Sequence, residues 1–316
     1  MPAGAPLLED AERACANGEC QKAIGLFENT LARQPHDFRL HYRLGLCYGG
    51  DCRPHPLVHA DMAVAYLRQA LHLIGAIPGR VRASVVDQLG NALCHQGGAP
   101  RTNALRAAIE CHREAAEIYQ SLGMADDCGR ARFNVGNSCC ELSEITGEDH
   151  WQEAVLHYRE SLRVRTREKD PERHAAVLEN LGSAYRRLPS ARKSIQCYQQ
   201  ALRIYTAAAH PEKSAALENN LGNAYLSLPS ADTKTKFRNA LRALRHFDRA
   251  LRIQGRDKTS RAFGVTQFNR AQAYHRLAQT AVEIACLQEA LSAFQACGEE
   301  RLTGLVRAQL DLLYRP

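Results

Sequence analysis

The chain has 316 residues, 45% of them apolar, and a formal net charge of +7. It contains no run of about 18 uncharged apolar residues, so a transmembrane helix is excluded, and residues 1–10 lack the basic and apolar regions of a secretory signal. We therefore expect a cytoplasmic protein without a membrane partner, and we expect its twelve cysteines to be reduced thiols.

One short motif recurs along most of the chain. It is clearest as Asn-Asn-Leu-Gly-Asn-Ala-Tyr at residues 219–225, and its copies are spaced by 45, 46, 46, 40 and 49 residues. Aligned on the glycine, the copies lie at Gly45, Gly90, Gly136, Gly182, Gly222 and, in degenerate form, Ala271. Repetition at about 20 to 50 residues indicates units that bury their apolar faces only by stacking on their neighbours. Strong helix formers fill the intervals, so we predict an all-helical chain.

Seven units follow in chain order. Their approximate limits are 6–35, 37–77, 81–123, 127–168, 171–207, 211–256 and 260–297, and an amphipathic segment at 299–314 is expected to cap the open end. Each unit reads as two helices. In all units but the first, the first helix carries the motif, and the second helix carries a small residue, usually an aromatic or Leu, and a second small residue. In the sixth unit these are Ala243, Phe247 and Ala250. The glycine-to-last-small-residue separation varies from 19 to 28 residues, and we expect the extra residues in the turn within each pair.

The pattern has a packing explanation. A glycine and a small residue where two helices cross let the backbones approach, while Leu, Tyr and Phe at helical spacing fill the adjacent space. These positions follow one another in the same order, and on both helices of the pair, as in the tetratricopeptide repeat (TPR) family, which the chain resembles. The long period and the Asn-Leu-Gly-Asn core resemble the kinesin-light-chain and Partner-of-Inscuteable subclass of that family. The resemblance implies an all-α TPR solenoid, a right-handed superhelix of about seven helix pairs plus a C-terminal capping helix, as a single array over residues 1–316.

The motif also carries asparagines that its packing does not need. They lie one residue before the Leu or one after the Gly, so they share one face of the first helix, which in this family lines the concave groove. The candidates are Asn91, Asn134, Asn137, Asn180, Asn220, Asn223 and Asn269. An amide offers a donor and an acceptor together, which suits the main chain of an extended peptide. The alternative is that these amides only bond neighbouring turns and repeats.

Four arginines fall on the same predicted face, Arg39, Arg43, Arg130 and Arg187. Guanidinium groups there would suit an acidic peptide or a terminal carboxylate. Arginine is common in this chain, so a simple solvated surface explains them equally well.

A second basic feature is confined to the sixth unit. Arginines recur at spacings of 4, 3, 4, 3 and 4 residues, at Arg238, Arg242, Arg245, Arg249, Arg252 and Arg256. This arginine stripe lies on one side of a helix, off the positions expected to pack. It could bind an acidic partner or a nucleic-acid backbone, although no aromatic residues alternate with the arginines as single-stranded RNA would prefer. The alternative is a solvated helix face.

A zinc site is a weaker candidate. Cys47, Cys52, His55 and His59 are closely spaced, but zinc sites usually have a shorter Cys-Cys spacing and a longer gap to the histidines. A buried Cys47 would equally pack as a small apolar group. No phosphate loop, dinucleotide fingerprint or metalloprotease helix is present, so we predict no cofactor and no catalytic residue.

The sequence therefore predicts a non-enzymatic protein-interaction module that binds an extended peptide or partner tail in the concave groove. The partner is another protein or peptide, an acidic one being favoured by the arginines; nucleic acid is disfavoured and self-association is compatible with the fold. The first alternative is a structural or adaptor subunit that packs the convex basic surface on a larger assembly, and the second is a zinc-binding protein.

Overall fold

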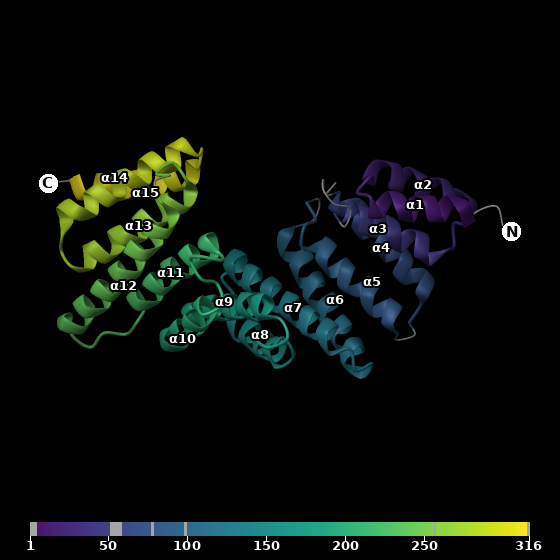
Figure 1. Cartoon of the computed structure of the whole chain (residues 1–316), viewed down its shortest axis with the longest axis horizontal. Coiled ribbons are helices and arrows are strands. Elements are labelled where there is room, and N and C mark those ends of the chain that lie inside the picture. The colour runs from purple at the N-terminus through teal and green to yellow at the C-terminus, as the bar shows by residue number, and fades with distance from the viewer. Residues whose placement is uncertain (1–4, 51–58, 77–78, 98–99, 256, 315–316) are drawn as a thin grey trace. The chain divides into compact units, whose positions relative to one another are not determined.

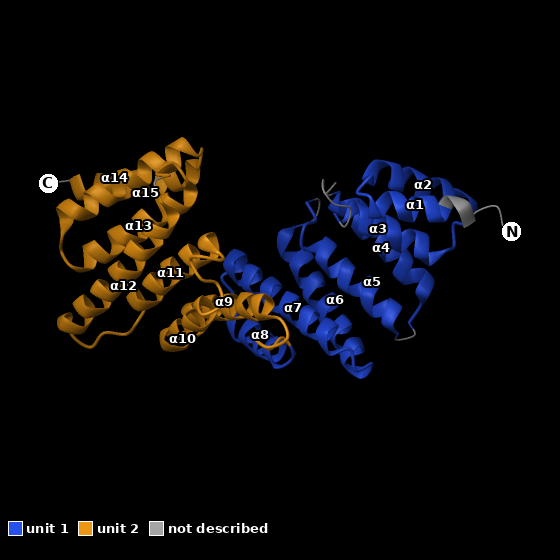
Figure 2. Cartoon of the chain, in the orientation of Figure 1, with its two compact units in different colours: residues 1–164 blue, residues 165–316 orange. Residues whose placement is uncertain are grey.

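A computed structural model describes residues 5–50, 59–76, 79–97, 100–255 and 257–314. Over these residues the chain forms fifteen α-helices and no strand. It divides into two compact units, residues 1–164 and 165–316 (Figure 2). The predicted all-helical fold class is confirmed.

Each unit is a succession of helices in which consecutive helices pack side by side (Figure 1). Unit 1 contains α1 (Ala5–Ala16), α2 (Cys20–Arg33), α3 (Phe38–Tyr48), α4 (Ala60–Ile74), α5 (Arg80–Leu93), α6 (Arg101–Ser121), α7 (Ala125–Thr146) and α8 (Trp151–Val164). Unit 2 contains α9 (Pro171–Arg187), α10 (Ala191–Leu202), α11 (Pro211–Leu226), α12 (Thr233–Gln254), α13 (Arg261–Arg276), α14 (Thr280–Ala296) and α15 (Glu300–Tyr314).

Local sequence signals fix several of these helix ends. The Asp170 side chain accepts a hydrogen bond from the backbone N–H of Arg173 at 2.9 Å and so caps α9. Asp232 caps α12 in the same way, because a side-chain oxygen at this position satisfies a backbone donor that the helix leaves free. A glycine ends α7 at its C-terminus. Gly147 has a φ of 75°, a left-handed conformation that glycine adopts without the steric cost that a Cβ would bring.

The motif glycines lie where the two helices of a pair cross. A Cβ at Gly136 would lie 2.5 Å from a ring carbon of Tyr158, and a Cβ at Gly182 would lie 2.7 Å from a ring carbon of Tyr198. A side chain at Gly136 or Gly182 would therefore clash with the tyrosine of the second helix; the seventh repeat has Ala271 at this position. The small residues of the second helix are fully buried on both sides of the large residue, which is Leu67 in α4, His112 in α6 and Tyr or Phe in α8, α10 and α12. Each of these small residues is 0% exposed: Ala63, Ala70, Ala108, Ala115, Ala154, Ser161, Ser194, Ala201, Ala243 and Ala250.

The location of the extra residues differs from the prediction. They do not all lengthen the turn within a pair; several form additional helical turns. The second helix α12 has 22 residues and α6 has 21, whereas α10 in the shorter fifth repeat has 12. Lys and Arg, which dominate the start of α12, are good helix formers and extend a helix readily into solvent.

The last helix closes the apolar face of α14. Val306 and Leu310 of α15 pack in one buried cluster with Leu287 and Phe294 of α14. In the ranges that the structure describes, no helix is long and apolar enough to span a bilayer.

Candidate functional site

Several predicted groove amides in unit 1 bind other side chains of the protein. The Asn134 amide of α7 donates to the Asn91 side-chain oxygen of α5 at 3.1 Å, and Asn91 donates to Gln88 at 3.1 Å. The Asn137 oxygen accepts from the Tyr158 hydroxyl at 2.8 Å. The Asn134 bond joins consecutive first helices, the Asn91 bond lies within α5, and the Asn137 bond joins the two helices of one pair.

Two predicted groove arginines of unit 1 are also engaged in ion pairs. Arg130 binds Asp87 of α5 and, at 2.7 Å, Asp127 of its own helix. Arg43 of α3 binds Glu12 of α1 at 3.0 Å. Arg39, at the start of α3, is exposed.

A buried acid and histidine lie behind Arg130. His112 takes the aromatic position of α6, and its Nδ1 lies 2.8 Å from the carboxylate of Asp87; both side chains are 1% exposed. Burial opposes protonation of His112, but hydrogen bonds with Asp87 and Cys94 and the Asp87 charge together raise its pKa. Asp87 thus links His112 of α6 and Arg130 of α7 in one charge network that joins α5, α6 and α7. The sequence pattern missed this network because Asp87 lies on neither motif position.

In unit 2 the first helices carry a different arrangement. Asn269 of α13 donates to Asn219 of α11 at 3.0 Å, so the partner is one residue before the predicted Asn220. Gln272 of α13 donates to Gln309 of α15 at 3.1 Å. Asn180 is half-buried in α9, and Arg187, at the end of that helix, is exposed.

Asn220 and Asn223 remain open. Both are half-buried in α11, and neither side chain forms a hydrogen bond with another residue of the described ranges. Because residues three and four apart share a helix face, Asn220 and Asn223 follow Ala216 along the exposed side of α11. Half-buried amides with unused donors and acceptors are suited to a ligand that brings complementary groups.

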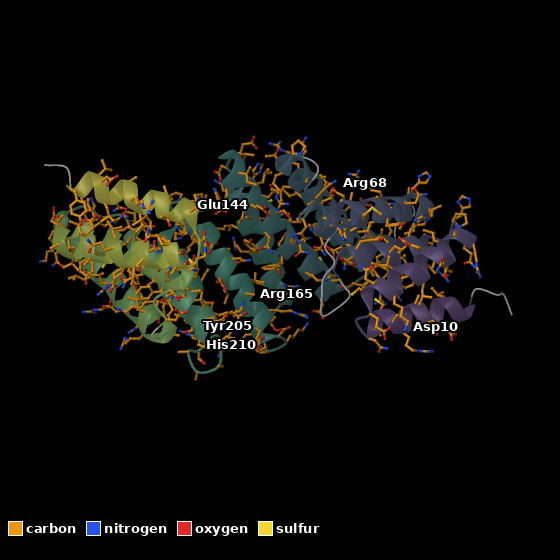
Figure 3. The ribbon with its side chains drawn as sticks, turned by 90° about the horizontal axis from the view of Figure 1, so that it is seen from above. Asp10, Arg68, Glu144, Arg165, Tyr205 and His210 are labelled. Atoms are coloured by element: carbon orange, nitrogen blue, oxygen red, sulfur yellow. The ribbon has the colours of Figure 1, made fainter. Side chains whose placement is uncertain are left out.

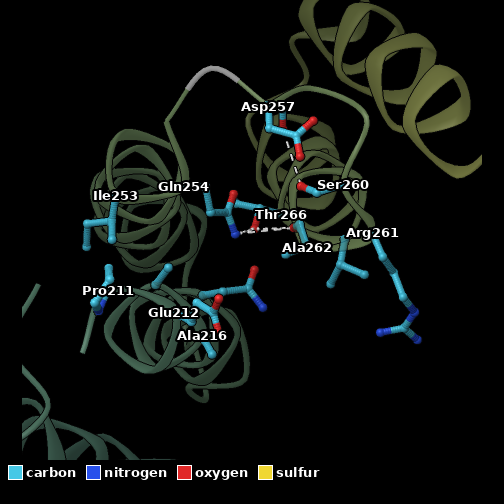
Figure 4. Close-up of a pocket in the computed structure, with 13 residues that line it drawn as sticks. Pro211, Glu212, Ala216, Ile253, Gln254, Asp257, Ser260, Arg261, Ala262 and Thr266 are labelled. Atoms are coloured by element: carbon cyan, nitrogen blue, oxygen red, sulfur yellow. Dashed lines mark hydrogen bonds between the residues drawn. The ribbon is translucent and has the colours of Figure 1, made fainter. Parts of the chain in front are cut away.

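A hollow of about 550 Å³ lies at the start of this face, between the ends of three helices of unit 2 (Figure 4). Its apolar lining comes from Ala215 and Ala216 of α11, Ile253 of α12, and Ala262 and Val265 of α13. Charged and polar residues complete the lining: Glu212, Asn219, Gln254, Asp257, Ser260, Arg261 and Thr266. An apolar floor with a few polar groups is typical of a binding pocket.

Gln254 lines this hollow and carries a buried acceptor. Its amide nitrogen donates to the backbone oxygen of Ala262 at 3.3 Å and to the Thr266 hydroxyl at 3.1 Å. The backbone oxygen of Ala262 can only accept a hydrogen bond, so the Gln254 nitrogen must face it. The nitrogen and oxygen of this amide therefore cannot exchange places. The Gln254 side-chain oxygen is then buried without a partner among the described residues, a state that costs free energy unless a ligand supplies a donor.

The loop before α11 holds one wall of the hollow in place. Tyr205 is 3% exposed, and its hydroxyl donates to the backbone oxygen of Glu172 at 2.7 Å. Its ring meets His210 edge-on, with centroids 5.2 Å apart (Figure 3). His210 immediately precedes Pro211, which lines the hollow. Neither Tyr205 nor Gln254 belongs to the motif, so the sequence pattern gave no signal for them.

The remaining candidates lie elsewhere. Five members of the arginine stripe are exposed along α12, and Arg256 lies outside the described residues. Of the zinc candidates, Cys52 and His55 also lie outside them, while Cys47 is buried in the apolar cluster of α1 to α3 and His59 contacts the Tyr48 ring edge-on. The described ranges contain no group of three metal-ligating side chains.

No family model and no curated protein matches the sequence. Solved structures do match. The C-terminal part of a TPR repeat-containing protein from Cytophaga hutchinsonii is 14% identical, with a TM-score of 0.62, over 90% of this chain and 95% of its own. Cut9 in the APC/C Cut9-Hcn1 hetero-tetramer is 14% identical, with a TM-score of 0.57, over 96% of this chain and 48% of its own.

A putative kinesin light chain with nearly identical TPR-like repeats, from Podospora anserina, is 14% identical, with a TM-score of 0.54, over 69% of this chain and 97% of its own. Likeness at this identity concerns the fold rather than a subclass or an activity. The helix pairs, the glycine crossings and these structural neighbours together show that the chain has the tetratricopeptide-repeat fold.

Proposed function

We propose that this protein is a non-enzymatic interaction module that binds an extended segment of a partner protein along α11 and α13. The observation that carries the proposal is the hollow beside α11, with its apolar floor and the unsatisfied Gln254 oxygen. Asn220 and Asn223 continue from the hollow along the same helix face. Cut9, which shares the fold, is part of a hetero-tetramer with Hcn1, so the fold is compatible with partner binding.

The chemistry of the face defines the ligand. The hollow accepts one apolar side chain, whose burial contributes about 1.5 to 3 kcal/mol. A small movement of the Gln254 side chain opens its buried oxygen to the hollow, where it accepts a main-chain N–H next to that side chain. The Asn220 and Asn223 amides bind the following main chain. Because amides recognise peptide groups rather than side chains, selectivity comes mainly from the anchor in the hollow.

The arginines predicted for the groove take a smaller part in this proposal. Arg43 and Arg130 already bind acids within unit 1, so an acidic ligand would compete with those pairs. Arg39 is exposed, and we propose it as the contact for acidic side chains of the partner. Arg187 is also exposed, but it interacts within the protein as well.

The test uses peptides selected from a random library displayed on phage against the full chain. Dissociation constants of the selected peptides are measured by fluorescence anisotropy for the wild type, an Asn220→Ala/Asn223→Ala variant and an Ala216→Trp variant that fills the hollow. Each variant is expected to weaken binding about tenfold or more, since tenfold corresponds to about 1.4 kcal/mol. The control is Ala281→Trp, at an exposed position of α14.

Circular dichroism confirms that each variant is folded. If the selected peptides bind both folded variants as tightly as the wild type, the proposal is wrong. The proposal is also wrong if the library yields no peptide whose binding is weakened by the Asn220→Ala/Asn223→Ala variant or by Ala216→Trp.

A further inference from the structure

The first turns of α12 expose a pair of large apolar side chains inside a basic surface. Phe237 is 38% exposed and Leu241 is 51% exposed. They line a surface hollow of about 620 Å³ together with Thr233, Lys234, Arg238, Arg242 and Arg245. We call these seven residues the α12 basic face. It is formed by the second helix of its pair, whereas the proposed peptide site follows the first helices α11 and α13.

Packing within unit 2 does not account for this face. α12 has 22 residues, against 16 in α11 and 16 in α13. No residue of α12 before Asn239 is buried, so its first turns cover no core. Phe237 and Leu241 are one helical turn apart and therefore project from the same side. Two adjacent large apolar side chains in contact with water gain free energy when a partner covers them.

The charge around this pair is almost entirely positive. Residues 227–247 contain Lys234, Lys236, Arg238, Arg242 and Arg245 but a single acid, Asp232. Asp232 is committed to capping α12, where it accepts from the backbone N–H of Thr235 at 2.6 Å. Arg238 and Arg245 form no ion pair with any residue of the described ranges. The Asp232 charge also acts on Arg238. A partner that brings carboxylates would therefore meet guanidinium groups that form no ion pair of their own.

We propose that the α12 basic face binds an acidic amphipathic helix of a partner protein. Phe237 and Leu241 are about 6 Å apart along the helix axis. Apolar residues three or four positions apart on a facing helix have a similar spacing, so they can pack against this pair. Packing of one helix on another then places acidic residues of the partner beside Arg238, Arg242 and Arg245. The proposal adds a second binding surface and does not depend on the peptide site.

Two other anionic partners fit less well. A nucleic-acid backbone would set phosphates against Leu241, and the single Phe237 provides no row of aromatic rings for successive bases. A bilayer surface calls for a broad apolar face, whereas here two apolar side chains are set among cations. The proposal therefore commits to a protein helix, with nucleic acid and membrane as outcomes of the test.

The experiment selects binders from a phage library of helical peptides randomised on one face, with counter-selection against a Phe237→Ser/Leu241→Ser variant. The selected peptides are expected to be rich in Asp and Glu, with apolar residues three or four apart. Anisotropy should show at least tenfold weaker binding to that variant and to Arg238→Glu/Arg245→Glu. Binding should also weaken between 50 and 300 mM salt, at roughly the concentrations where charge interactions become screened.

Matched controls lie on other helices of unit 2. Val282→Ser changes an apolar residue of α14 that is 39% exposed, and Arg301→Glu/Arg307→Glu changes two exposed arginines of α15. Both should leave affinity within about twofold. The proposal is overturned if the library yields no acidic helical peptide whose binding requires Phe237 and Leu241. It is also overturned if a 20-nucleotide single-stranded DNA, or phosphatidylserine vesicles, bind tightly through these residues while no helical peptide does.

Discussion

The side-chain amide of Asn134 donates a hydrogen bond to the side-chain oxygen of Asn91 at 3.1 Å, linking α7 to α5 across 43 residues. This bond assigns a packing role to two asparagines that the sequence pattern placed in a ligand groove. Asn220 and Asn223 occupy the corresponding motif positions of α11 without such a bond within the described ranges. The same motif residue can therefore join repeats in one helix and stay available in another.

The two kinds of asparagine should separate in stability measurements. Asn134→Ala removes the bond to Asn91 and leaves a half-buried oxygen without its donor, so we expect a loss of about 0.5 to 1.5 kcal/mol. Asn223→Ala should change the free energy of unfolding by less than about 0.5 kcal/mol. Urea unfolding followed by circular dichroism measures both. Equal losses for the two variants would contradict the distinction.

The motif glycines should be intolerant of even one methyl group. Gly136→Ala would place its Cβ 2.5 Å from the Tyr158 ring, and we expect a loss of about 1 to 3 kcal/mol from overpacking. The control is Gly25→Ala in α2, where no atom lies within 4 Å of the added Cβ. It should stabilise the protein by about 0.5 to 1 kcal/mol, because alanine is the better helix former. Thermal unfolding should rank the variants on opposite sides of the wild type.

The fold could be predicted from the sequence because packing depends on residue size at fixed spacings. Gly136, Gly182 and their aromatic partners Tyr158 and Tyr198 lie where the repeat pattern places them. Helix lengths were predicted less well, since the surplus residues of the sixth repeat extend α12 as well as the turn before it. The boundary between turn and helix depends on local propensity, which the repeat spacing does not contain. The subclass suggested by the long period stays a prediction.

The candidate site was predictable only in part. Asn269 bonds to Asn219 and not to the predicted Asn220, and one residue along a helix turns a side chain by about 100°. Which of two adjacent amides faces the next repeat depends on the offset between neighbouring helices, which differs with the repeat length. The hollow depends on where α12 ends beside α13, so Gln254 has no counterpart in the motif.

The Asp87–His112 pair predicts a pH dependence of stability. The pKa of His112 is raised in the folded state, because its hydrogen bonds with Asp87 and Cys94 and the nearby Asp87 charge outweigh the effect of burial. Protonated His112 therefore stabilises the folded protein. This stabilisation is fully present at a pH below the pKa of histidine in the unfolded chain, about 6.5, and it is lost as the pH rises through the pKa of His112 in the folded protein. Arg130 also faces Asp87 and keeps that carboxylate neutralised when the imidazole loses its proton.

The measurement compares the wild type with His112→Phe, which places at this position the residue that α12 has at Phe247. The stability difference between the two proteins should be largest near pH 6 and should shrink towards pH 9 in urea titrations. His157 affects the pH dependence of stability in the opposite direction, because burial chiefly lowers its pKa. Since both proteins contain His157, its contribution cancels in the difference between them. A difference that stays constant over this range would contradict the assignment of His112. Asp87→Ala should cost more, about 3 to 5 kcal/mol, because it leaves a buried partner uncompensated.

The cysteines should differ widely in reactivity. Burial raises the pKa of the Cys111 thiol to about 12, with the charge of Glu114 adding to the effect, and burial also raises the pKa of Cys139. Cys297 lies exposed just after α14. The thiolate is the reactive form, so iodoacetamide at pH 8 should modify Cys297 well before Cys111 or Cys139. Peptide mapping by mass spectrometry follows each site, and in urea the three rates should converge. Rapid native labelling of Cys111 would mean that α6 opens locally from its neighbours, which its packing between α5 and α7 argues against.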